Sequence, residues 1–208
     1  GQALAVALTG RRKAVPLPRI IEKIRNHERK NTMTIKDQLT PEQWKFVFNA
    51  PMAAATYVST SSGGGMEMIK EIMQVGKFMA QESQAGDSSY GELVSDYLNL
   101  MKTMSKDEMK ANSIEYQNTK DVAAVREQTK QTVANAWAAV SALPGADGFA
   151  KWIVEIGRTA ALTKTGGHFG IGNKSVIDEK EQAALDELAA LLGVSASEAV
   201  QNLDAPAA

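Results

Sequence analysis

The sequence predicts an all-α protein, a bundle of six to eight amphipathic helices, and three observations support this. Ser, Thr or Asp followed three residues later by Glu or Gln, the signature of a helix start, occurs in five places that precede apolar residues. Those apolar residues recur at helical spacing. No window of four to eight residues alternates between apolar and polar side chains as a half-buried strand would. Helices striped in this way are buried by packing against one another.

The composition is that of a globular protein without a cofactor signature. The chain has 208 residues, of which 44% are apolar and 23% charged, enough to bury a core without a disulfide or a metal. The absence of cysteine excludes disulfides, thiolate catalysis and cysteine-bound metal centres, and two histidines leave little for a histidine metal site. The longest mostly apolar stretch, residues 46–58, is shorter than the roughly 20 residues of a spanning helix. We therefore expect a cytoplasmic protein without a membrane span or cofactor.

The first helix is predicted to begin at Thr40, whose hydroxyl caps it while Pro41 and Gln43 complete the start signal. Pro51 is expected either to kink this helix or to restart it with Asn49 as the new cap. The following helix, residues 51–60, carries a face of small alanines that permits close approach of a neighbour. The run of Ser and Gly at residues 61–65 should end it.

Three further helical stretches are predicted in the middle of the chain. The first, from residue 66 to 79, has its apolar stripe at Met66, Ile69, Ile72, Met73 and Met79, with Lys70 and Glu71 outside it. The second, capped by Ser89 and extending to Met104, should bury Leu93, Tyr97, Leu100 and Met101. The third is a polar helix over residues 106–143, interrupted near Asn118, with Val122, Val125, Val133, Trp137 and Val140 inward.

Two substantial helices are predicted after the break at residues 144–145. One carries Phe149, Trp152, Ile153, Ile156 and Ala160 on one face, and the other carries Ala184, Leu185, Leu188, Ala189 and Leu192. A short helix over residues 196–203 should follow. We expect one helical domain over residues 33–204 and a frayed tail at residues 205–208.

The charge divides sharply along the chain. Residues 1–32 carry a net charge of +6 and the remaining residues −7. One hypothesis is a basic arm that binds nucleic acid or an anionic membrane. The other is that residues 1–32 are not translated in the native protein, because the first methionine is Met33 and helical patterning starts just after it. Nucleic-acid binding is expected only if the arm is translated.

A weak internal repeat links two regions that share an apolar helix, a glycine-rich break and a helix with an acidic start. Glu71 of the first region and Glu181 of the second occupy corresponding positions. This pattern resembles the tellurite-resistance TerB-type helical proteins, over residues 50–79 and 152–192. The resemblance implies a stress-linked, non-enzymatic protein with an acidic metal-binding surface, although neither turn here contains an Asp-Gly pair.

The glycine-rich stretch at residues 165–175 is the only one with chemical character. Its candidate ligand-binding residues are Gly166, Gly167, His168, Lys174 and Ser175. The stretch comes within one inserted residue of a phosphate-binding loop, but the insertion and the helix expected before it favour a simple helix connection. Any ligand is nevertheless expected here, because glycine amides and a helix start can attract a weakly bound anion.

Three acidic side chains and one histidine complete the candidates. Asp178 and Glu181 could bind a metal ion, but carboxylates in a first helical turn also cap its amides. His168, Glu155 and Glu181 are the acid–base candidates if a pocket lies under the glycine-rich stretch. No residue is predicted to be catalytic in the favoured interpretation.

Seven of the nine methionines fall in adjacent helical segments and could form a deformable groove for a protein partner, although filling of the helical core is the favoured explanation. They are Met66, Met68, Met73, Met79, Met101, Met104 and Met109. The favoured hypothesis is a non-enzymatic helical scaffold or interaction protein that binds a partner or a second copy. The alternative is a small-ligand binder or enzyme with its pocket under residues 166–175.

Overall fold

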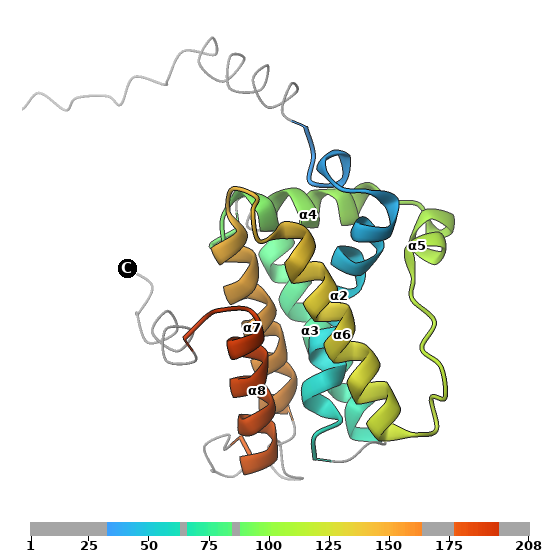
Figure 1. Cartoon of the computed structure of the whole chain (residues 1–208), viewed down its shortest axis with the longest axis vertical. Helices are drawn as coiled ribbons and strands as arrows, with labels where there is room; N and C mark the ends of the chain where they lie inside the picture. The colour runs from blue at the N-terminus through green and yellow to red at the C-terminus, as the bar shows by residue number, and fades with distance from the viewer. Residues whose placement is uncertain (1–32, 63–65, 85–87, 164–176, 196–208) are drawn as a thin grey trace, which may run out of the picture. The chain divides into compact units, whose positions relative to one another are not determined.

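The computed structural model describes residues 33–62, 66–84, 88–163 and 177–195. The chain divides into two units, Gly1–Met33 and Thr34–Ala208, and the fold described below is that of the second. Within the described residues it contains helices and no strand, which confirms the all-α prediction (Figure 1). The elements are a 3-10 turn, η1 (Lys36–Gln38), and the helices α2 (Pro41–Ser59), α3 (Met66–Gln84), α4 (Glu92–Thr103), α5 (Lys106–Asn112), α6 (Val122–Val140), α7 (Ala146–Thr163) and α8 (Glu179–Leu191).

No helix in this described part of the chain combines the length and the apolar character needed to cross a membrane.

The predicted helix starts are confirmed at three positions and wrong at one. Thr40, Ser105 and Asp178 each accept a hydrogen bond from the third helical amide, and the side chain of that third residue bonds back to the cap. Ser89 does not cap α4, because Gly91, with a φ of 96°, is the residue that precedes the helix. The Ser89 hydroxyl lies 3.4 Å from a carboxylate oxygen of Glu82 instead. The fifth predicted box includes Glu198, which lies outside the described residues.

Helix α2 lies at the centre of the fold and packs against α3, α5, α6, α7 and α8. Its alanines at positions 50, 53, 54 and 55 are buried, which confirms the predicted small face. The helix runs unbroken through the buried Pro51, so neither a restart nor a cap at Asn49 occurs. Pro51 has no amide to donate, so the helix lacks one backbone hydrogen bond, that to the carbonyl of Val47. The Asn49 side chain donates separately to the carbonyl of Lys45, at 2.7 Å.

The core is organised around aromatic rings from three helices. Trp44 of α2 lies 6.1 Å from the ring of Tyr97 on α4, and Tyr97 lies 5.2 Å from Trp152 on α7. The buried Tyr97 hydroxyl donates to the carbonyl of Phe48 at 2.9 Å, so its polar end is satisfied. All five residues of the predicted stripe on α7 are fully buried, and the five on α8 are buried as well.

The predicted inward face of α3 is wrong in phase, and one residue of the predicted face of α6 is wrong. On α3, Met73 is 58% exposed whereas Glu71 is fully buried, because the inward stripe consists of Glu71, Val75, Phe78 and Met79. These four residues have the same helical spacing as the predicted stripe. Because one of them, Glu71, is charged, the sequence pattern predicted that a different face of α3 is buried. Val122, predicted inward, is 43% exposed because it lies in the first turn of α6, beyond the packed part of the helix.

The connection between α5 and α6 was predicted as an interrupted helix, and this is wrong over residues 113–120. Those residues, which we call the strap, leave the end of α5 at Asn112 without helix or turn as far as Tyr116 (Figure 1). The strap then bends at residue 117 and ends in a turn at residues 119–120, with Asn118 at a φ of 52°. Ser113, Glu115 and Gln117 are exposed, while Ile114 and Tyr116 are half-buried. Residues 113–117 therefore alternate between polar and apolar side chains. This short run forms part of the strap and is not a strand of a sheet.

Glycine is required at position 148, where α7 approaches the turn before α4. A Cβ atom there would lie 1.8 Å from the carbonyl oxygen of Tyr90. We predict that Gly148→Ala lowers the free energy of unfolding by about 3 kcal/mol, because backbone must move to admit the methyl group. The matched control, Gly76→Ala, meets no atom within 4 Å. It should raise that free energy by roughly 0.5–1 kcal/mol, the usual helical preference of Ala over Gly.

Denaturant unfolding of the two variants and the wild type measures both effects. A Gly148→Ala protein as stable as the wild type would contradict the close approach of α7 to Tyr90.

Candidate functional site

The candidate ligand-binding residues Gly166, Gly167, His168, Lys174 and Ser175 lie outside the described residues. The predicted site on the glycine-rich stretch, and the alternative pocket beneath it, therefore stay predictions.

The candidate metal ligands Asp178 and Glu181 are brought together as a helix cap. The amide of Glu181 donates to Asp178 Oδ1 at 2.8 Å, and the amide of Asp178 donates to Glu181 Oε2 at 3.3 Å. Glu181 is only 1% exposed, and its Oε1 accepts a hydrogen bond of 3.0 Å from Ser62, just after α2. This carboxylate thus fastens the start of α8 to the end of α2. In the part of the chain that is described, no cluster of three or more His, Asp or Glu side chains could hold a metal ion.

Glu155, the acid–base candidate on α7, is buried beside a cation of the same helix. One of its oxygens lies 4.0 Å from Nη1 of Arg158. Burial raises the pKa of Glu155, and the Arg158 guanidinium opposes that rise. The nearby charge of Glu155 also helps to raise the pKa of Tyr90, after the larger effect of burial.

The two glutamates that the internal repeat places in correspondence, Glu71 on α3 and Glu181 on α8, are both buried, on helices that pack against the same two neighbours. Helix α3 packs against α2 and α7, and α8 packs against the same two helices, which also pack against each other. The helix pairs α2–α3 and α7–α8 are therefore arranged alike around one central contact.

The predicted methionine groove is only partly described. Met73 is exposed on α3, whereas Met79, Met101, Met104 and Met109 are half-buried and pack against the core. The side chains of Met66 and Met68 lie outside the described residues. The described methionines therefore fill the edge of the core while leaving part of their surface accessible.

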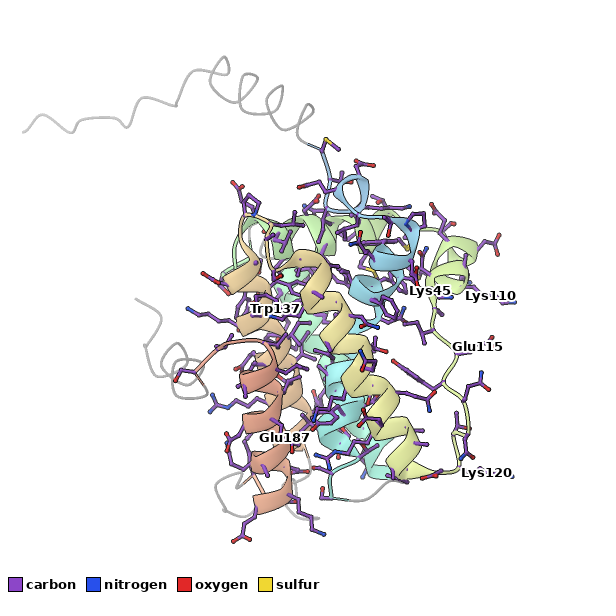
Figure 2. All side chains as sticks on the ribbon, in the orientation of Figure 1. Lys45, Lys110, Glu115, Lys120, Trp137 and Glu187 are labelled. Carbon is purple, nitrogen blue, oxygen red and sulfur yellow. The ribbon has the colours of Figure 1, made fainter. Side chains whose placement is uncertain are left out.

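A polar cluster that the sequence did not predict joins α2, α6 and α8. The hydroxyl of Tyr57 donates to a carboxylate oxygen of Glu187 and accepts from Arg126 at 3.2 Å. Glu187 also lies within ion-pair distance of Arg126 and Lys130, at 3.4 and 3.7 Å (Figure 2 labels Glu187). The guanidinium carbon of Arg126 lies 4.7 Å from the centre of the Tyr57 ring. The cluster therefore links α2, α6 and α8 through side-chain hydrogen bonds and ion pairs.

The strap is held at its first end by Asn49 of α2. The side-chain nitrogen of Asn49 donates to the carbonyl of Asn112 at 2.7 Å, and the side-chain oxygen of Asn49 accepts from the amide of Ile114 at 3.2 Å. Both bonds go to backbone atoms, so they do not depend on the strap's side chains. Asn49, expected as a helix cap, is instead a tertiary anchor.

Gln128 of α6 holds the strap's other end in the same way. Its side-chain oxygen accepts from the amide of Gln117 at 2.7 Å, and its side-chain nitrogen donates to the Gln117 carbonyl at 2.8 Å. Between the two anchors, Tyr116 is half-buried, and burial raises its pKa. We define the α2–α6 face by Asn49 and Gln128, which hold the strap through backbone groups.

The chain matches no protein-family model, no curated protein and no solved structure. The α2–α6 face is consequently interpreted from its geometry alone.

All four tyrosines of the chain have a raised pKa, chiefly because each is buried or half-buried. For Tyr57, burial and then the hydrogen bond to Glu187 raise the pKa to about 12. We predict that the folded protein shows little tyrosinate absorbance at about pH 10.5, where the unfolded protein, with pKa values near 10, is mostly ionised. Stability should be fully present below about pH 10 and fall above it, because the unfolded state releases its protons first.

Absorbance titration of folded and urea-unfolded protein measures this difference. Tyr57→Phe should lessen the loss of stability between about pH 10 and 12, since one raised pKa is removed. A tyrosinate signal in the folded protein with its midpoint near 10 would contradict the burial of these rings.

Proposed function

We propose that this protein is a non-enzymatic helical interaction protein that binds a protein partner on the α2–α6 face. The observation that carries the proposal is the attachment of the strap. Two carboxamides, Asn49 and Gln128, each make a pair of hydrogen bonds to backbone groups, Asn49 at the junction of α5 with the strap and Gln128 at residue 117. Backbone hydrogen bonds also supply affinity when a protein binds a peptide segment of a partner.

The reactive side chains of the described residues support the same proposal. Asp178 and Glu181 cap α8, Glu187 joins three helices, and Glu155 is paired with Arg158. Each of these carboxylates has a structural partner that explains its position. We also propose a cytoplasmic location and a stress-linked role of the TerB type, which the matching arrangement of α2–α3 and α7–α8 supports.

Site-specific photo-crosslinking in cells that produce the protein naturally tests the proposed function. A benzophenone side chain replaces Gln131, an exposed residue of α6 one turn beyond Gln128. The control replaces Glu92, an exposed residue at the start of α4, a helix that supplies neither anchor of the strap. We predict a crosslinked protein of discrete mass from position 131 and none from position 92, with the partner peptide identified by mass spectrometry.

A second copy of this chain crosslinked at position 131 would also support the proposal. No discrete product from position 131, or the same products from both positions, would contradict a partner-binding role for this face.

A further inference from the structure

We draw no further inference here: the strongest candidate, the side-chain cluster of Glu155 and Arg158 on α7 with Tyr90 in the turn before α4, carries nothing beyond the raised pKa of Glu155 and of Tyr90, because within the described residues no hydrogen bond joins the three side chains and the one ion pair among them spans 4.0 Å.

Discussion

The close packing of α2 is the constraint on which the rest of the structure depends. This helix packs against α3, α5, α6, α7 and α8, and its buried alanines let α6 and α7 approach it without large side chains between them. A helix surrounded in this way cannot move without disturbing its neighbours. Polar residues on α2 are therefore held in fixed positions, among them Asn49 near the middle of the helix and Tyr57 near its end.

The hydrogen bonds from α2 to its neighbours, made by Tyr57 and by Asn49, depend on this rigidity. Tyr57 reaches Arg126 and Glu187, which ties α6 and α8 to the central helix, while Asn49 reaches the backbone beyond α5. Because α6 is held against α2, Gln128 has a fixed position relative to Asn49. The two carboxamides can therefore both bind the strap. Preorganised donors and acceptors of this kind bind a chain at a lower entropic cost than mobile ones.

Most of the fold could be predicted from the sequence because helix caps and apolar stripes are local signals. Three capping boxes and the complete stripes of α7 and α8 were predicted correctly. The strap could not be predicted, since Asn49 and Asn112 are separated by 63 positions and only the packing of α2 brings them together. The polar cluster spans 130 positions from Tyr57 to Glu187 for the same reason. Glu71 was misplaced because a charged residue within an inward stripe carries no local sign of burial.

Hydrogen exchange of the wild-type protein, followed amide by amide, tests the central claim that the α2–α6 face holds the strap by its backbone. The amides of Ile114 and Gln117 are the ones that donate to Asn49 and Gln128. They should exchange distinctly more slowly than the amide of Glu115, which lies between them on the exposed side of the strap. Equal and rapid exchange of all three amides, with α6 still protected, would show that the strap is not bound and would contradict the account.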